Sequence, residues 1–448
     1  MGDGGTGSET EGSAIVRRSS EGAERLAINR LSASEMARRI AQGELTSEAV
    51  VSACLARIRE RDPVVQAWAY LDPDFALREA RARDREPSRG PLHGVPVGVK
   101  DVIDTADMPT QMGSPIYRGH RPRADASCVA LVRAAGAVVL GKTTTFEFAG
   151  MTPDATTHPL DPAHTPGGSS SGSGAAVADF MVPVAFGTQT GGSVLRPAAF
   201  CGVFGYKPTF GRFNRAGVKP AAESLDTIGL IARSIEDLEL VDAVLVGRKP
   251  ASCGSLPAPA IGACRTHLWP MAQAETVAAF EDSATKLKQA GANVRELTLP
   301  AIFGELTAAR ERISDYERAR GLAHEWQHNR EQISERLRRC MERGFALAPE
   351  AYWSSQQLVQ RCRLLLVEAM HGIDALLVPC APGEAPRGID YGGDPKMQEL
   401  WTLLGTPSMT LPTHRGPNGL PVGIQLVTRS GSEDTLFGTA RWVWQVLH

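Results

Sequence analysis

The stretch "PGGSSSGSGAAVADFMVPVAFGTQTGGSVLRPAAFCGVFGYKP", residues 166–208, places eight consecutive glycines and serines directly before a long, largely apolar segment. A Gly/Ser run ordinarily predicts a flexible linker, which is out of place beside a segment with the composition of a domain core. The glycines instead indicate a backbone shape that directs serines and N–H groups toward a ligand. A second glycine turn, "TQTGGS" at 188–193, follows shortly afterwards.

The sequence on both sides of this stretch alternates between strand and helix patterns, which argues for a sheet covered by helices. A helix is expected in "TSEAVVSACLARIRERD", capped by Thr46 or Ser47. "SLDTIGLIARSIEDLELVDAVLVG" predicts a strand and then a helix, with Ser234 as the N-cap. The other predicted elements are strands in 93–104, 138–143 and 182–187 and helices in 125–137 and 173–180.

The chain is expected to form one domain after an N-terminal tail. Residues 1–26 have the composition of a disordered tail, and residues 27–448 are assigned to a single domain. A Pro/Gly/Ser-rich connector is predicted at 249–262, and helical patterns dominate 274–370. Strand patterns return in "IDALLVPCAP" and "LPVGIQLVT" near the end, so a helix-rich insertion interrupts the α/β domain.

The composition excludes several classes of protein. A net charge of −2 provides no overall field that would favour nucleic acid or an anionic membrane as partner. No apolar run reaches the roughly 18 residues needed to span a bilayer, and no secretory signal is visible, so a cytoplasmic location is expected. The eight cysteines show no C-x-x-C spacing and are expected to be core thiols.

Three generic motifs fail on their context. No lysine follows the 167–174 glycines, as a phosphate loop requires. Gly168 to Gly172 match the nucleophile elbow G-x-S-x-G, but polar sequence and no strand precedes them. Ser283 to Lys286 match S-x-x-K, yet Lys286 is expected on the side of its helix opposite the buried stripe.

Several motifs taken together resemble the amidase signature family. They are Lys100 in "GVPVGVKD", the Gly/Ser loop with Ser169 and Ser170, and Ser193 in "GTQTGGSVLRP", which stands 24 positions after Ser169. "PLHGVP", "GAVVLGKT", "PAAFCGVFGYKPT" and "GLPVGIQLV" also fit the family. The resemblance covers most of 30–446 and is weakest in the helix-rich variable region at about 265–370, which is expected to supply the pocket walls. It implies an α/β fold with a mixed central β-sheet covered by helices on both faces.

The resemblance implies a Ser–Ser–Lys triad, in which Ser193 is the nucleophile, Ser169 on a cis peptide bond relays protons, and Lys100 is the base. An exposed lysine has a pKa of about 10.4 and is protonated at pH 7. Burial disfavours the charged form and can leave a neutral amine that accepts a proton. The apolar "VPVGV" before Lys100 is consistent with such burial.

The same resemblance places the oxyanion hole at the second glycine turn. Amide hydrolysis passes through a tetrahedral oxyanion that needs preorganised donors. Gly191 and Gly192 allow the backbone N–H groups of Thr190, Gly191, Gly192 and Ser193 to converge on one point. Taken one at a time, Lys100 could be a surface lysine, Ser169 a turn residue and Ser193 a helix cap.

The turn departs from the commoner family pattern G-T-D-x-G-G-S-I-R-x-P at two positions. Gln189 replaces the aspartate, and Arg196 stands three residues after the nucleophile instead of two. Malonamidase-like members resemble this variant and use the shifted arginine for a substrate carboxylate. We therefore expect Arg196, with Ser170 and Gln189, to contact substrate; the alternative is that Arg196 pairs with a protein acid or backbone carbonyls.

The implied function is hydrolysis of the C–N bond of a small amide through an acyl-enzyme, with no metal and no organic cofactor. A carbamate, urea-derivative or ester hydrolase with the same triad remains an alternative. So does an amidotransferase subunit that works with a partner chain, although the variant turn argues against it, and a nucleotide- or phosphate-binding module is a third. Neither nucleic acid nor membrane is an expected partner, and self-association as a homodimer is left open.

Overall fold

The computed structural model describes residues 1, 28–249 and 257–448. The predicted disordered tail, residues 1–26, lies outside the described residues apart from Met1, and so does Cys253. Among the described helices, none is long and apolar enough to cross a membrane.

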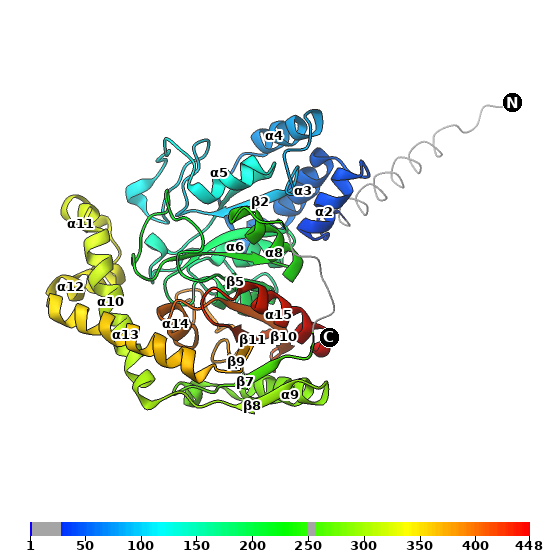
Figure 1. Ribbon diagram of the computed structural model, residues 1–448. Coiled ribbons are helices and arrows are strands. Elements are labelled where there is room, and N and C mark those ends of the chain that lie inside the picture. Colours follow the sequence, from blue (N-terminus) through cyan, green and yellow to red (C-terminus); the bar gives the residue numbers. More distant parts are fainter. Residues whose placement is uncertain (2–27, 250–256) are drawn as a thin grey trace.

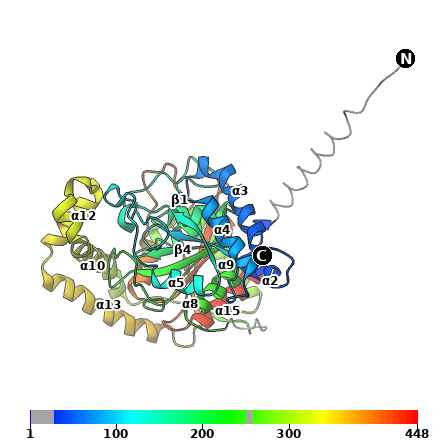
Figure 2. The same ribbon diagram turned by 90° about the horizontal axis from the view of Figure 1, so that it is seen from above.

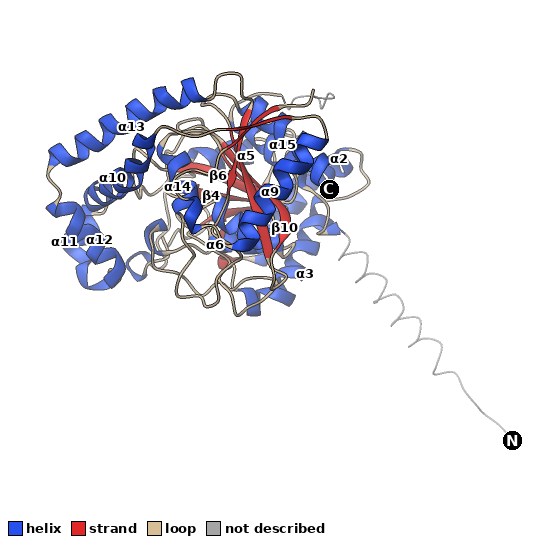
Figure 3. Ribbon diagram, turned by 90° about the horizontal axis from the view of Figure 1, so that it is seen from below, coloured by secondary structure: helices blue, strands red, loops and turns tan. Residues whose placement is uncertain are grey.

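One sheet of eleven strands runs through the described chain, in the order β1-β3-β2-β4-β6-β5-β10-β11-β9-β7-β8. Helices cover both of its faces, as Figures 2 and 3 show. The strands are β1 Trp68–Leu71, β2 Pro96–Lys100, β3 Val138–Thr143, β4 Val184–Gln189, β5 Phe204–Lys207, β6 Thr227–Ala232, β7 Ala260–Ala263, β8 Asn293–Glu296, β9 Ala375–Pro379, β10 Ser408–Arg415 and β11 Pro421–Val427. This arrangement confirms the mixed α/β fold that the sequence indicates.

The centre of the sheet is buried on both faces, and this burial explains its near-continuous apolar strands. β2 lies between β3 and β4 and is parallel to both, with Val97 opposite Val139 and Val184. β4 pairs antiparallel with β6, and β10 and β11 form an antiparallel pair beside β5 and β9. The carboxyl ends of β2 and β4 therefore lie at the same edge of the sheet, which brings their following loops together.

The helices fall into two groups (Figure 1). Those that cover the sheet are α2 Ala33–Ala41, α3 Ser47–Val65, α4 Pro73–Arg85, α5 Ser127–Ala134, α6 Ser171–Ala178, α7 Leu195–Cys201, α8 Ile235–Leu245, α9 Ala274–Gln289, α14 Lys396–Leu403 and α15 Glu433–Leu447. A helical lobe stands to one side and consists of α10 Leu306–Gly321, α11 Ala323–Asn329, α12 Glu335–Ala346 and α13 Pro349–Ala369.

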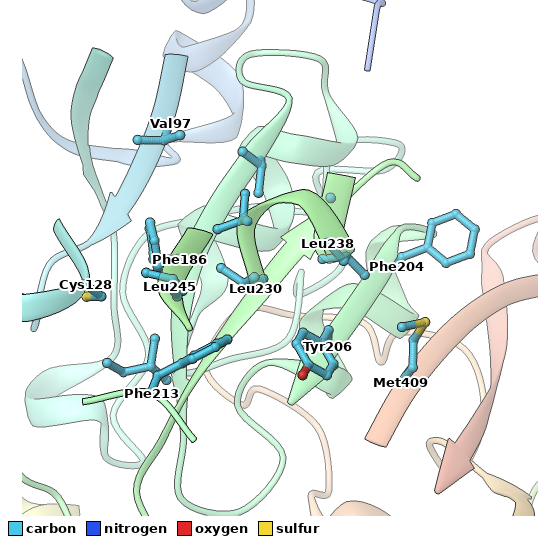
Figure 4. Packing of buried hydrophobic residues seen from close by; sticks show 14 of the residues in the cluster. Val97, Cys128, Phe186, Phe204, Tyr206, Phe213, Leu230, Leu238, Leu245 and Met409 are labelled. Carbon is cyan, nitrogen blue, oxygen red and sulfur yellow. The ribbon is translucent and has the colours of Figure 1, made fainter. Parts of the chain in front are cut away.

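The largest hydrophobic cluster lies against the middle strands of the sheet. Figure 4 shows Phe186 and Leu230 on neighbouring strands, with Leu238 from the helix that covers them and Tyr206 close by. Tyr206 is buried and donates its hydroxyl hydrogen to Asp242 at 2.8 Å, so its polar atom is satisfied within the core. Burying this much apolar surface fixes β2, β4 and β6 relative to one another, and these strands position the site.

Several of the predicted helix ends are confirmed. Thr46 caps α3 by accepting a hydrogen bond from the N–H of Ala49, and Ser234 caps α8 by accepting from Asp237. The helix predicted at 173–180 begins earlier, at Ser171, inside the Gly/Ser run. All seven described cysteines are buried and free, as expected for core thiols.

Two predictions about the middle of the chain are wrong in part. The connector at 249–262 ends before Ala260, since β7 begins there, and the helical region 274–370 contains the strand β8. β8 has the sequence "NVRE", is mostly exposed and lies at the sheet edge, so it shows no apolar alternation. β1, β5 and β10 are further strands that the sequence patterns did not separate from their surroundings.

Candidate active site

Lys100 ends β2 and has no exposed surface. Its Nζ donates to Ser169 Oγ at 2.8 Å and to the hydroxyl and carbonyl oxygens of Thr188 at 2.9 and 3.3 Å. Burial lowers the pKa of Lys100 to about 7, although the carboxylates of Asp226 and Asp154 partly oppose this shift. The amine therefore titrates near neutral pH instead of staying protonated.

Ser169 lies in the Gly/Ser loop, which is a tightly held segment of the core. The Gly168–Ser169 peptide bond is cis, as the family resemblance implies. Ser171 donates to Asp154 at 2.5 Å, and Ser173 donates to the carbonyl of Phe186 at 2.8 Å. A Cβ on Gly168 would overlap the Phe146 ring, so only glycine permits this approach.

Ser193 follows the second glycine turn and precedes α7. It is 8% exposed, whereas Lys100 and Ser169 are 0% exposed, so it is the member of the predicted triad that faces open space. Its carbonyl accepts a hydrogen bond from the N–H of Ser170 at 3.2 Å, which joins the two serine loops. Within the described residues, the Ser193 hydroxyl has no hydrogen-bond partner.

The turn that precedes Ser193 presents unused backbone donors. The N–H groups of Thr190, Gly191, Gly192 and Ser193 donate to no other described residue. All four residues line a cavity of about 610 Å³. A Cβ on Gly192 would overlap Gln398 Oε1, so a side chain at this position would force the turn to move. The arrangement offers several donors to a ligand in the cavity.

Much of the rest of the cavity wall comes from the helical lobe, from residues 391–395 and from the start of α14. α10 contributes Arg310 and Arg318, and α12 contributes Arg336 and Arg343. Residues between 265 and 370 thus form part of the cavity wall, as expected. The sequence did not indicate the second contribution, which comes from Tyr391 to Lys396 and from Glu399.

Arg196 also lines the cavity and is 6% exposed. One Nη donates to the carbonyl of Gly168, whereas Nε and the other Nη have no partner among the described residues. Burial lowers the pKa of Arg196 to about 10, so the guanidinium is charged at neutral pH. A buried guanidinium with unused donors beside Ser193 is suited to hold an anionic group.

Gln189 and Ser170, the other two residues expected to contact substrate, do not line the cavity. Gln189 Oε1 accepts from the N–H groups of Val194 and Leu195 at 2.8 and 3.0 Å, and its Nε2 donates to Thr402. Ser170 Oγ exchanges hydrogen bonds with the backbone of Thr188. Through these hydrogen bonds, both side chains hold the two serine loops in place without facing the cavity.

Two residues that the sequence analysis missed support the site. Thr188 supplies two of the three acceptors of Lys100, and it lies within the motif that carries Gln189. The Asp226 carboxylate accepts a hydrogen bond from the Thr190 hydroxyl at 2.6 Å and further hydrogen bonds from the N–H groups of Ala221 and Ala222. Asp226 is distant in sequence, and no pattern around it indicated this contact.

The alternative S-x-x-K motif does not form a site with this cavity. Lys286 is 49% exposed and pairs with Asp282 at 2.8 Å. Neither Ser283 nor Lys286 lines the cavity. In the part of the chain that the structure describes, no group of three or more His, Cys, Asp or Glu side chains is arranged to hold a metal ion.

Residues 49–437 match the family model described as Amidase. Among curated proteins, the chain is 34% identical to a glutamyl-tRNA(Gln) amidotransferase subunit from Chloroflexus aggregans, over 89% of this chain and 92% of that protein. It is 33% identical to the subunit of the same name from Streptomyces coelicolor, over 92% and 94%. These relatives weigh against the expectation that the variant turn sets the chain apart from amidotransferase subunits.

Solved structures show the same fold. A crystal structure described as an amidase superposes with a TM-score of 0.86 and is 30% identical, over 93% of this chain and all of that one. The native peptide amidase from Stenotrophomonas maltophilia gives a TM-score of 0.79 and 31% identity, over 93% and 96%.

Proposed function

The chain belongs to the Amidase family, and from this premise we propose that it cleaves the C–N bond of a small amide through an acyl-enzyme on Ser193. The observation that carries the proposal is the buried 2.8 Å hydrogen bond between Lys100 Nζ and Ser169 Oγ, in a loop that Ser170 joins to Ser193, which lines the cavity. This arrangement pairs a titratable base with a hydroxyl relay, as nucleophilic catalysis by serine requires.

The proton follows the three side chains in order. Lys100 in its neutral form accepts a proton from Ser169 Oγ, and Ser169 accepts the proton of Ser193 as Ser193 Oγ attacks the amide carbonyl. The tetrahedral intermediate collapses when the C–N bond breaks, and the proton held by Lys100 returns through Ser169 to the leaving nitrogen. Water then attacks the acyl carbonyl and gives a proton through Ser169 to Lys100. The proton returns through Ser169 to Ser193 Oγ as the acyl C–O bond breaks and the acid is released. A lysine with a pKa of about 7 suits both directions of transfer.

The 190–193 turn is proposed to stabilise the oxyanion. Its four N–H groups are unused within the described residues and border the cavity. Donors that are fixed before the reaction lower the barrier because they need no reorganisation when charge develops. Thr402 and Asp226 hold the turn through Gly191 and Thr190, which supports the required rigidity.

The preferred substrate is proposed to be an amide that also carries an anionic group. Arg196 contributes two unpaired buried donors to the cavity, and neutralising a buried guanidinium with a carboxylate is favourable. The cavity is also lined by five other basic residues, Arg310, Arg318, Arg336, Arg343 and Lys396. Four acidic residues line it as well: Glu311, Asp315, Asp394 and Glu399. The basic side chains outnumber the acidic ones, which favours an anionic ligand.

A serine-directed fluorophosphonate tests the nucleophile. Intact-mass analysis is expected to show one adduct per chain, mapped to Ser193, and Ser193→Ala is expected to lose both the adduct and amide hydrolysis. Ser283→Ala, which removes the serine of the S-x-x-K motif, should retain both. An adduct on Ser283, or undiminished turnover by Ser193→Ala, would refute the proposal.

The curated relatives favour a second candidate, in which this chain is the amide-cleaving component of an amidotransferase and works with a partner chain. The chemistry at Ser193 would be the same, but the released ammonia would be used by the assembly. Hydrolysis of small amides by the purified chain alone would exclude an obligatory partner. Activity that appears only when a partner chain is added would support the second candidate.

A further inference from the structure

Arg310 and Glu399 form an ion pair in the cavity wall that the mechanism above does not use. Arg310 Nη2 lies 3.0 Å from Glu399 Oε1, and the side chains are 20% and 7% exposed. Arg310 comes from α10 in the helical lobe, whereas Glu399 comes from α14 on the sheet side of the cavity. The pair therefore joins the lobe to the body of the protein beside the catalytic serine.

Both members of the pair lie close to Gly191 in the 190–193 turn. A Cβ built on Gly191 would lie 2.9 Å from Arg310 Nη2 and 3.2 Å from Glu399 Oε1. The carbonyl of the same glycine accepts a hydrogen bond from Thr402 Oγ1, also on α14, at 2.6 Å. Gly191 is thus held through its carbonyl and covered at its Cα, and these contacts restrict how far its peptide groups can rotate.

The charges of the pair matter because they lie next to the place where an oxyanion would form. Burial raises the pKa of Glu399, while Arg310 and Arg196 oppose that shift. A carboxylate paired with a guanidinium presents little net charge to the turn. Without Arg310, an unpaired acid would remain against Gly191 and would repel a developing negative charge.

We propose that Arg310 and Glu399 are positioning residues that fix the 190–193 turn, so that oxyanion stabilisation depends on a contact from the helical lobe. This inference rests on the proposed acyl-enzyme function. In this proposal, Arg310 helps to stabilise the transition state and does not bind the substrate in its ground state. Its Nε is buried and has no partner among the described residues, but the proposal gives this atom no role in substrate binding. Residues that act on the transition state alone lower kcat and leave KM nearly unchanged.

The test compares Arg310→Met, Glu399→Gln and the double variant in steady-state hydrolysis of one amide substrate. We expect Arg310→Met to lower kcat about 10- to 100-fold with KM within about 3-fold of wild type. The double variant should be no slower than Arg310→Met, because removing the unpaired carboxylate offsets the loss of its partner. The pH midpoint of kcat should stay unchanged, since Lys100 is untouched.

Arg312→Met is the matched control, with the same change on the same helix. Arg312 Nε donates to Ser355 at 2.8 Å and does not line the cavity, so kcat should stay within about 2-fold of wild type. Thermal melting checks that each variant is folded, and Glu399→Gln, which keeps the side-chain shape, remains informative if Arg310→Met unfolds.

Three results would overturn the proposal: kcat of Arg310→Met within about 2-fold of wild type, a rise in KM without a fall in kcat, or losses that multiply in the double variant. A separate result would refute the proposed acyl-enzyme on Ser193: in that case Ser193→Ala would keep its amide hydrolysis, independently of the kinetics of the Arg310 variants.

Discussion

The buried network of Lys100, Ser169 and Thr188 together with the 190–193 turn, of which only the turn lines the cavity, is called the floor of the site. It differs from the roof, which is the part of the cavity wall that α10 and α12 form. Lys100 and Ser169 are buried, and Lys100 Nζ donates hydrogen bonds to Ser169 Oγ and to the Thr188 hydroxyl. The roof carries charged side chains such as Arg336, which is exposed, and Arg343, which is 60% exposed on its side chain. The floor is preorganised, whereas much of the roof is solvated.

This difference indicates that the floor serves bond cleavage and the roof serves substrate selection. A buried network keeps fixed geometry and shifted pKa values, both of which bond cleavage needs. Solvated charges contribute little to stability and can change without loss of the fold, so the roof suits substrate selection. The comparison is sharpened by changes on the floor that should slow chemistry and by a change at Arg196, on α7 in the cavity wall, that should alter substrate preference.

The largest expected effect is on the base. Lys100→Met should lower kcat/KM about 10²- to 10⁴-fold, because general-base assistance is lost. In the wild type, kcat/KM should rise with pH through about 7 and level off above it, since only the neutral amine accepts a proton and its pKa is about 7. Initial rates between about pH 5.5 and 9 measure both effects.

Lys207→Met is the matched control for this change. Lys207 is also fully buried, and burial lowers its pKa to about 7, but its Nζ donates to the carbonyls of Pro208 and Thr406, away from the cavity. A folded Lys207→Met variant should keep the alkaline rise. Loss of the rise in this variant, with retention in Lys100→Met, would show that the wrong lysine was assigned.

A smaller effect is expected at the turn itself. Gly192→Ala places a Cβ on top of Gln398 Oε1, so the turn or Gln398 must shift and the N–H groups lose alignment. We expect kcat to fall about 10²-fold, comparable to the loss of one oxyanion donor. Gly304→Ala is the control, because nothing lies within 4 Å of its Cβ position. Equal kinetics for the two variants would argue against a role for the turn.

The smallest effect concerns substrate preference. Arg196→Met should reduce kcat/KM for a dicarboxylate half-amide about 10-fold more than for a neutral amide of similar size, since a charge-assisted pair is lost only with the anionic substrate. The ratio of the two kcat/KM values, measured for wild type and variant, is the readout. A proportionate loss on both substrates would mean that Arg196 only supports Gly168.

Much of the site was predictable because its motifs are local. Lys100, Ser169 and Ser193 stand in short segments whose glycines signal close backbone approach, and the structure brings Lys100 and Ser169 into hydrogen-bond contact. Gln189 was harder to interpret, because an amide in a ligand-binding loop and an amide that holds a turn look alike in sequence. Its three hydrogen bonds assign it to the turn.

The sequence by itself indicated the family, the mixed α/β fold and the candidate triad of Lys100, Ser169 and Ser193, because the strand and helix patterns and the motifs that carry the family resemblance are encoded over short stretches. Only the tertiary structure decided that Asp226 supports Thr190 and that Arg310 and Glu399 meet over Gly191. These pairs are separated by tens of residues along the chain, and what brings them together is burial of the sheet and packing of the lobe, which no local pattern records.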